Sequence, residues 1–241
     1  MNKEFKSKKR NNLDIALIHD WYKSDSFGGG EKTVKEIFEV LKIHTSLDIN
    51  LYALYKDKTF KKSNWLFNKY VKTSFIQDLP LSNYLLRYYL PLFPIAIEQF
   101  NLEKYKVIVS SSHSVAKGVL TSPDQIHISY VHTPMRYAWD LMNLYISNSN
   151  HKKFLKPIIR YQIHKLRIWD QLSSQRIDKI IANSNFTARR IKKYWGRESK
   201  VIFPPVDVDK FNYKSNRGDF YLSVCRLVIN KRVDLLVRAF N

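Results

Sequence analysis

The chain has 241 residues, of which 44% are hydrophobic, and this is enough to form a buried core and to argue against a chain that is disordered throughout. Its formal net charge of +20 favours an anionic partner: a nucleic acid, an anionic membrane surface or a phosphorylated small molecule. The single cysteine, Cys225, excludes a disulfide within the chain and a zinc site built from cysteines.

The amino-terminal tail and the most apolar stretch bear on where the protein resides. Residues 1–12 form a basic tail, and the short apolar run that follows it lacks a small-residue cleavage site, so no secretory signal is predicted. The stretch Leu79–Ile97 is interrupted by Arg87 and by prolines, and falls short of the roughly 20 apolar residues that cross a bilayer. We therefore expect a cytoplasmic protein without a transmembrane helix.

Short β-rich runs alternate with helical patterns along most of the chain. The run at residues 14–19 is followed by a loop and then by a helix in which Val34, Ile37, Phe38 and Leu41 share one face. A basic amphipathic helix is predicted at 158–172, with Ile159, Ile163, Leu166, Trp169 and Leu172 on its apolar side. Further strands are predicted at residues 49–54, 106–110, 127–131, 179–182 and 201–203. This alternation predicts an α/β fold of the Rossmann type, a parallel sheet with helices on both faces and ligands at the carboxyl ends of its strands.

A domain boundary is predicted near residue 205. Residues 205–219 are polar and contain proline and glycine, which is typical of a linker, so we expect an N-terminal domain at 13–204 and the start of a second domain at 220–241. Within the second domain, residues 220–226 have the pattern of a strand and residues 232–240 that of a helix. A strand and one helix cannot bury a sheet face alone, so the second domain is expected to be incomplete in this chain.

The run Gly28-Gly29-Gly30-Glu31 lies between a predicted strand and a predicted helix. Glycines let the backbone approach a ligand, and the amino end of a helix presents free N–H groups to an anion. The spacing matches neither the dinucleotide fingerprint nor a Walker P-loop. Two interpretations remain open, a phosphate cradle and a simple tight turn.

Polar residues also follow two of the predicted strands. His132 and Arg136 come after the strand that ends at Val131, and His113 comes after the serine run that begins at Ser110. The carboxyl end of a strand favours a functional role, but His132 and Trp139 could instead be buried structural residues, and the serines could be a polar helix cap rather than ligands of a sugar.

Two basic groups lie further along the chain. Asn183 and Ser184 form a polar cap before a basic helix, which by itself indicates a solvated face. Arg226 and Lys231 are spaced so that both could reach one phosphate group. The templates for metal sites and serine hydrolases are absent from the sequence, so no protein-held metal is expected.

Taken in order, these runs resemble the retaining family 4 glycosyltransferases of the GT-B type, over nearly all of residues 13–241. The segments that carry the resemblance are His19-Asp20-Trp21, Gly28–Lys32, Ser110–Gly118, Tyr130–Asp140, Ile180–Ser184, Pro204–Asp207 and Arg226–Asp234. The resemblance implies two Rossmann-like domains that face each other across a cleft, the first for the acceptor and the second for the sugar nucleotide.

The resemblance also implies a role for individual residues. Gly29 and Gly30 would approach the donor diphosphate, and His132 would hydrogen-bond the donor sugar near the reacting carbon. Arg226 and Lys231 would neutralise the diphosphate as it leaves. Contacts to the acceptor or the sugar are expected from His113, Arg136 and Asn183. Neither a metal nor another cofactor is expected.

The form of the motifs resembles bacterial mannosyltransferases of surface-polysaccharide assembly, which implies GDP-mannose as donor and a lipid-linked glycan as acceptor. The protein would then lie on the inner face of the cytoplasmic membrane, with its basic surface and the aromatic segment Tyr84–Phe93 toward anionic lipid. A separate chain could supply the remaining donor domain with its paired glutamates. Two alternatives stay open: an inactive remnant or acceptor-binding module, and a nucleic-acid-binding protein, for which no motif is present.

Overall fold

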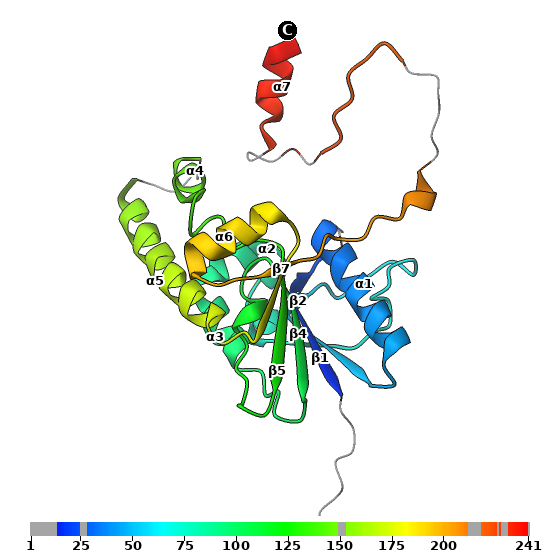
Figure 1. Ribbon diagram of the computed structural model, residues 1–241. Coiled ribbons are helices and arrows are strands. Elements are labelled where there is room, and N and C mark those ends of the chain that lie inside the picture. Colours follow the sequence, from blue (N-terminus) through cyan, green and yellow to red (C-terminus); the bar gives the residue numbers. More distant parts are fainter. Residues whose placement is uncertain are drawn as a thin grey trace, which may run out of the picture. The chain divides into compact units, whose positions relative to one another are not determined.

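The chain forms two units, Met1–Pro205 and Val206–Asn241. In the computed structural model, the residues that are described are 14–24, 28–148, 153–211, 218–225, 227 and 231–240. The first unit contains the sheet and most of the helices (Figure 1).

The first unit is built on a seven-stranded sheet in which every neighbouring pair is parallel, in the order β3-β2-β1-β4-β5-β6-β7. Its strands are β1 (Ile15–Tyr22), β2 (Ile49–Lys56), β3 (Val71–Thr73), β4 (Val107–Ser112), β5 (Ile126–Val131), β6 (Lys179–Ala182) and β7 (Lys200–Val201). The predicted Rossmann-like α/β fold is confirmed. The sequence pattern missed β3, which is too short to show an alternation.

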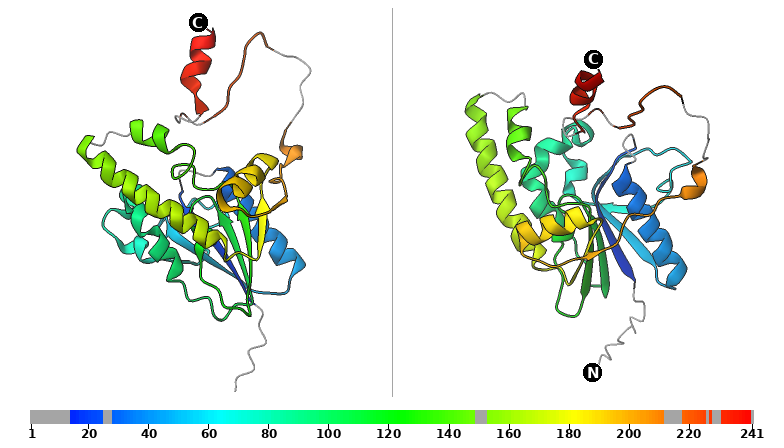
Figure 2. Two further views of the ribbon diagram at one scale, coloured as in Figure 1. Left: turned by 60° about the vertical axis from the view of Figure 1, so that its left-hand side comes forward. Right: turned by 45° about the horizontal axis from the view of Figure 1, so that its top comes forward.

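Helices cover both faces of this sheet (Figures 1 and 2). The helix α1 (Gly29–His44) packs on one face, and α3 (Phe93–Glu98), α5 (Lys156–Ser174) and α6 (Asn185–Trp195) pack on the other. The shorter helical segments are η1 (Phe75–Asp78), α2 (Ser82–Leu85), η2 (Leu86–Leu92), η3 (Ala116–Gly118), α4 (Met142–Ser147) and η4 (Lys153–Leu155).

The central strand β1 shows why the sheet is buried on both sides. Ala16 and Ile18 belong to the core beneath α3 and α5, whereas Ile15 and Leu17 belong to the core beneath α1. Successive side chains of a strand point to opposite faces, so an unbroken apolar run is what a doubly covered strand requires.

The order of the strands reverses direction between β1 and β4. The chain proceeds from β1 to β2 and β3 on one side, and from β4 to β7 on the other. In an open parallel sheet, such a switch point leaves a crevice at the carboxyl ends of the two strands, where ligands bind. The fold therefore directs attention to the ends of β1 and β4.

The apolar side of α5 differs in part from its prediction. Ile163 and Leu166 are buried as expected, but Leu172 is 61% exposed, and the polar residues Asp170 and Ser173 take fully buried positions. The prediction for Leu172 was wrong because buried hydrogen bonds of Asp170, described below, determine which face of the carboxyl-terminal half points inward.

The second unit contains η5 (Val208–Lys210) and α7 (Val233–Phe240), the latter in agreement with the predicted helix. The strand predicted at 220–226 is wrong for its described residues, because 220–225 have no regular structure and are exposed. A strand needs a neighbour for its backbone N–H and C=O groups, and the described part of Val206–Asn241 contains none.

No helix among the described residues is long and apolar enough to cross a bilayer. The segment Tyr84–Phe93, predicted to face a membrane, is mixed in exposure. Tyr84 is 79% and Tyr88 68% exposed, but Leu86 and Phe93 are buried in the core beneath α3.

Close packing at Gly118 provides a test of this fold. A Cβ atom at this position would lie 2.3 Å from Cζ2 of Trp169 on α5. Gly118→Ala should therefore lower the free energy of unfolding by about 1–3 kcal/mol, measured by urea denaturation, because the indole has to move out of a packed interface.

Gly29→Ala is the matched control, because a Cβ atom there would meet nothing within 4 Å. This change should leave stability unchanged or raise it by less than about 1 kcal/mol, since alanine favours the helical conformation. Equal stability of the Gly118→Ala variant and the wild type would contradict the packing described here.

Candidate functional site

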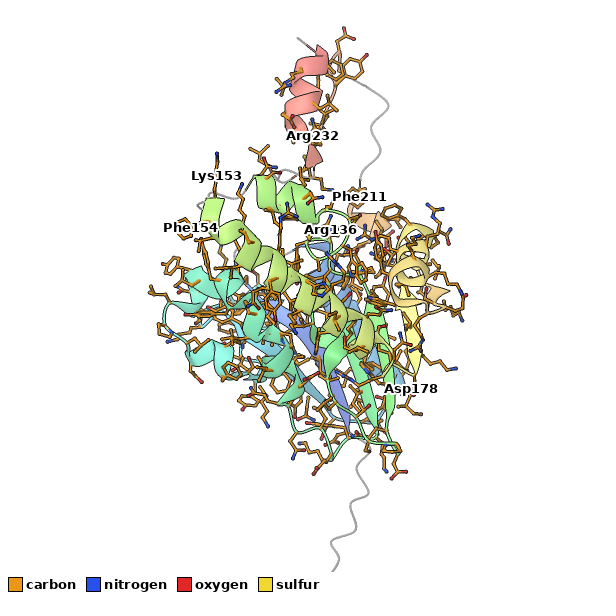
Figure 3. The ribbon with its side chains drawn as sticks, turned by 90° about the vertical axis from the view of Figure 1, so that its left-hand side faces the viewer. Arg136, Lys153, Phe154, Asp178, Phe211 and Arg232 are labelled. Carbon is orange, nitrogen blue, oxygen red and sulfur yellow. The ribbon has the colours of Figure 1, made fainter. Side chains whose placement is uncertain are left out.

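Polar side chains gather at the carboxyl ends of β1, β4 and β5, next to the beginning of α1. His19 and Asp20 lie near the end of β1, His113 follows β4, and His132 follows β5. In Figure 3, the label of Arg136, in the loop after β5, marks this end of the sheet. The label of Asp178, just before β6, marks the opposite end. We call His19, Asp20, His113 and His132 the histidine cluster.

The carboxylate of Asp20 is fully buried and holds the loop after β4. It accepts hydrogen bonds from four consecutive backbone N–H groups, those of His113 (2.6 Å), Ser114 (3.0 Å), Val115 (2.6 Å) and Ala116 (2.7 Å). Its Oδ2 also lies 3.0 Å from Nδ1 of His113. One side chain of β1 therefore fixes both the backbone of this loop and the ring of His113.

This arrangement makes Asp20 and His113 an ion pair. Burial by itself raises the pKa of Asp20, but the charge of His113 and its hydrogen bonds outweigh burial and lower that pKa well below its ordinary value. Burial likewise lowers the pKa of His113, but the charge and hydrogen bond of Asp20 outweigh it, and the pKa of His113 is raised. His113 is therefore the member of the cluster that is favoured in its cationic form.

The other two histidines contact Ser111 and are favoured as neutral rings because they are buried. His132 Nε2 lies 2.9 Å from the hydroxyl of Ser111, and His19 Nδ1 lies 2.8 Å from its backbone oxygen. Burial, followed by the charges of His19 and His113, lowers the pKa of His132 to about 3, and burial also lowers the pKa of His19.

The tautomer of His19 follows from its partner. A backbone oxygen only accepts, so Nδ1 of His19 must carry the proton, and Nε2 is an acceptor. That Nε2 atom is buried and has no hydrogen-bond partner among the described residues. It could accept a hydrogen bond from a hydroxyl group of a ligand.

The glycine run begins α1 directly beside these rings. Gly28 is the residue before the helix, and its N–H donates to Oε2 of Glu31 at 2.9 Å. A Cβ atom on Gly30 would lie 3.8 Å from Cε1 of His19 and 3.9 Å from the ring of His132. The amino end of α1 therefore opens toward the histidine cluster, and the phosphate-binding role of Gly29 and Gly30 stays a prediction.

Among the other predicted contacts, Arg136 and Asn183 belong to the same end of the sheet. Arg136 is exposed, and its charge acts against protonation of His113, which places the two cations near each other. The N–H of Asn183 donates to the backbone oxygen of Val131 at 3.3 Å, so the end of β6 is tied to the end of β5.

The structure does not test the role of the two predicted phosphate cations. Lys231 is exposed in the second unit. Arg226 lies outside the described residues, so whether the two converge on a phosphate stays a prediction.

The basic helix after Ser184 is only partly the solvated face that its pattern indicated. The hydroxyl of Ser184 accepts from the N–H of Thr187, which confirms the predicted cap. Arg190, however, is 7% exposed and makes two hydrogen bonds to the carboxylate of Asp140, which the helical pattern did not indicate because Asp140 comes from the loop after β5.

The sequence alone predicted no role for His19 or Asp20, and it left Ser111 open between a sugar ligand and a helix cap. A usable signal was present, because two polar residues with titratable side chains interrupt an otherwise apolar strand near its end. Which backbone or ring each one meets depends on the neighbouring strand and was not visible in the sequence. Within the described ranges, no group of three or more His, Cys, Asp or Glu side chains is arranged to hold a metal ion.

Comparison with known proteins identifies a family. The model of the family described as Glycosyltransferase Family 4 matches residues 27–210, which is well over half of the chain. No curated protein was found to match it.

The ion pair of the histidine cluster can be tested by Asp20→Asn. Without the carboxylate charge, burial dominates, and the pKa of His113 should fall below 6.5, its ordinary value, as measured by NMR titration of the imidazole resonances. Asp124→Asn is the control, because it removes one exposed carboxylate at the opposite end of the sheet. An unchanged pKa of His113 in the Asp20→Asn variant would contradict the pairing.

The same pair sets a pH dependence of stability. Because its folded-state pKa is raised, His113 stabilises the wild-type fold at pH values below its unfolded pKa, and this contribution is lost as the pH rises through the folded pKa. Asp20→Asn should abolish that fall, measured as unfolding free energy against pH.

Proposed function

Because the chain belongs to glycosyltransferase family 4, we propose that it acts in the transfer of a hexose from a nucleotide sugar to an acceptor, with retention of configuration. The observation that carries this proposal is the meeting of His132 and Gly30 at the carboxyl end of the sheet. One offers a neutral imidazole to a sugar hydroxyl, and the other lies at a helix amino end that suits a diphosphate.

In the proposed reaction, an acceptor hydroxyl forms a bond to the anomeric carbon of the sugar. The bond from that carbon to the diphosphate oxygen breaks, and the diphosphate leaves with the electron pair, while the hydroxyl proton passes to the leaving group. Gly29 and Gly30 would bind the diphosphate, and Arg226 and Lys231 would neutralise its charge. His113, Arg136 and Asn183 would contact the acceptor or the sugar.

We propose mannose as the sugar and GDP-mannose as the donor. Support comes from the resemblance of the runs His19–Trp21 and His132–Asp140 to bacterial mannosyltransferases of surface-polysaccharide synthesis. The proposed acceptor is a lipid-linked glycan, and a separate chain with a donor domain could complete the cleft. No metal is invoked for the departure of the diphosphate.

An acceptor-binding module without turnover is the second candidate. It is favoured by the extent of the family match, which ends at residue 210, close to the limit of the first unit. In this case the histidine cluster would bind a glycan acceptor without catalysing transfer.

A transfer assay tests the first candidate. The purified chain is incubated with radiolabelled GDP-mannose and a lipid extract that contains the acceptor, and labelled lipid is measured. Transfer is expected, and His132→Ala should reduce it by about a hundredfold, the scale observed when one preorganised hydrogen-bond donor is removed.

His44→Ala is the matched control, since His44 is exposed at the far end of α1. The control should transfer at the wild-type rate. Absence of transfer together with binding of the lipid extract would overturn the transferase proposal in favour of the acceptor-binding module.

A lipid-linked acceptor also calls for contact with an anionic membrane surface on the cytoplasmic side. Exposed aromatic and basic side chains on the face opposite α1 support this proposal. Tyr84 and Tyr88 flank the exposed Arg87, and Lys153 and Phe154 project from the beginning of the α5 region (Figure 3). Such a mixture suits the boundary between headgroups and acyl chains.

Vesicle sedimentation tests this contact. The combined change Tyr84→Ser and Tyr88→Ser should weaken binding to phosphatidylglycerol vesicles by about tenfold, because two partly inserted aromatic rings are lost. Tyr70→Ser serves as the control, since Tyr70 is 84% exposed next to β3. Equal binding of the double variant and the control would contradict the proposed contact.

A further inference from the structure

A lysine and an aspartate form an ion pair in the interior of the first unit. Lys117 is 1% exposed and Asp170 is 0% exposed, and the Nζ of Lys117 lies 2.9 Å from Oδ1 of Asp170. Lys117 belongs to η3 and Asp170 to α5, so the pair joins segments that are far apart in the sequence.

Tryptophan side chains surround this pair. Oδ2 of Asp170 accepts from Nε1 of Trp139 at 2.8 Å and from Nε1 of Trp195 at 2.7 Å. The Nζ of Lys117 donates to the hydroxyl of Ser173 at 2.9 Å and lies over the rings of Trp169 and Trp195, at 4.8 and 5.1 Å from their centroids. Neither the ammonium group of Lys117 nor the carboxylate of Asp170 can contact water while these interactions are kept.

Both residues of the pair are connected to the histidine cluster, through the chain or through hydrogen bonds. Lys117 directly follows the loop 113–116 that Asp20 holds, and Trp139 lies in the loop that begins with His132. Trp195 ends α6, and Thr187 near the other end of α6 donates through its hydroxyl to the backbone oxygen of His132 at 3.2 Å. The carboxylate of Asp170 therefore ties together the segments after β4, β5 and β6.

Stability alone does not explain the pair. A buried ion pair gains little net stability, because the cost of removing two charges from water offsets their attraction, and apolar side chains of similar volume often serve as well. Directional hydrogen bonds to one carboxylate, however, fix the distances between the segments whose side chains donate them.

We propose that Lys117 and Asp170 are positioning residues, which hold the loop after β4 and the loop after β5 so that the rings of His113 and His132 lie beside each other in the histidine cluster. This inference rests on the proposed function, because the residues act through the site of transfer.

The two loops are held in different ways besides the pair. The loop after β5 has further anchors, because Trp139 stacks on Tyr194 with ring centroids 4.6 Å apart and Arg190 binds Asp140. The loop after β4 is held by Asp20 through the N–H groups of residues 113–116, and Lys117 follows this run directly. Loss of the pair should therefore change the contact between Asp20 and His113.

Three variants of the full chain separate positioning from stability: Lys117→Met, Asp170→Asn and the double variant. Each single change leaves one buried charge without a partner and should lower the melting temperature. The double variant removes both charges, keeps an amide oxygen for the tryptophan N–H groups, and should recover most of the lost melting temperature.

The deciding measurement is the pKa of His113, followed by NMR in each variant. If the pair positions the loop, the double variant regains stability while the pKa of His113 stays lowered by about one unit, because its contact with Asp20 is loosened. Under the proposed reaction, kcat should fall by up to about a hundredfold, the scale of a misplaced reacting group, with KM for GDP-mannose less affected.

Ile76→Ala is the control for a loss of stability as such, because Ile76 is fully buried beneath α3 and outside the histidine cluster. It should lower the melting temperature without changing the pKa of His113. A wild-type pKa of His113 in the double variant would overturn the inference. The NMR readout needs no turnover, so failure of the proposed function would be seen separately, as absent transfer by the wild-type chain.

Discussion

The site depends on one buried carboxylate. Asp20 lies near the end of a largely apolar central strand, and its two oxygens accept hydrogen bonds from four backbone N–H groups of the neighbouring loop while facing the ring of His113. An uncompensated carboxylate at this depth would be very costly, so the loop after β4 must take the conformation that satisfies it. The loop after β4 is thereby fixed beside the switch point between β1 and β4, and His113 has a counter-ion.

Three neighbouring histidines differ in the protonation state that their surroundings favour, because Asp20 favours the cation of His113 whereas burial favours neutral rings for the other two. His113 faces Asp20 and is favoured as a cation, whereas His132 and His19 bind the hydroxyl and the backbone oxygen of Ser111 and are favoured as neutral rings. A cation and neutral hydrogen-bonding groups beside a helix amino end suit a ligand that has both an anionic group and hydroxyl groups, as a sugar phosphate does. Behind the cluster, the carboxylate of Asp170 joins the segments that carry these rings.

Much of the fold was predictable because periodic burial is a local property. The strands at β1, β2, β4, β5 and β6 and the helices α1 and α5 follow from apolar spacing alone, and the polar residues at the strand ends indicated where a site would lie. The failures share a cause, because in each case a partner from elsewhere in the chain decides the outcome. Leu172 is exposed and Arg190 is buried because hydrogen bonds of Asp170 and of Arg190 to Asp140 outweigh the local pattern. Residues 220–225 form no strand because the described part of their unit contains no strand to pair with.

The sequence by itself determined the class of fold and the resemblance to a glycosyltransferase family, which the match over residues 27–210 bears out, and it predicted the end of the sheet at which a site would lie. Only the tertiary structure decided which charges meet. Asp20 and His113 are 93 residues apart, and Lys117 and Asp170 are brought together by the packing of α5 against η3. The physical reason is that apolar burial depends on spacing along one element, whereas a buried charge requires a particular partner in a fixed direction, and strand order and helix packing supply that partner.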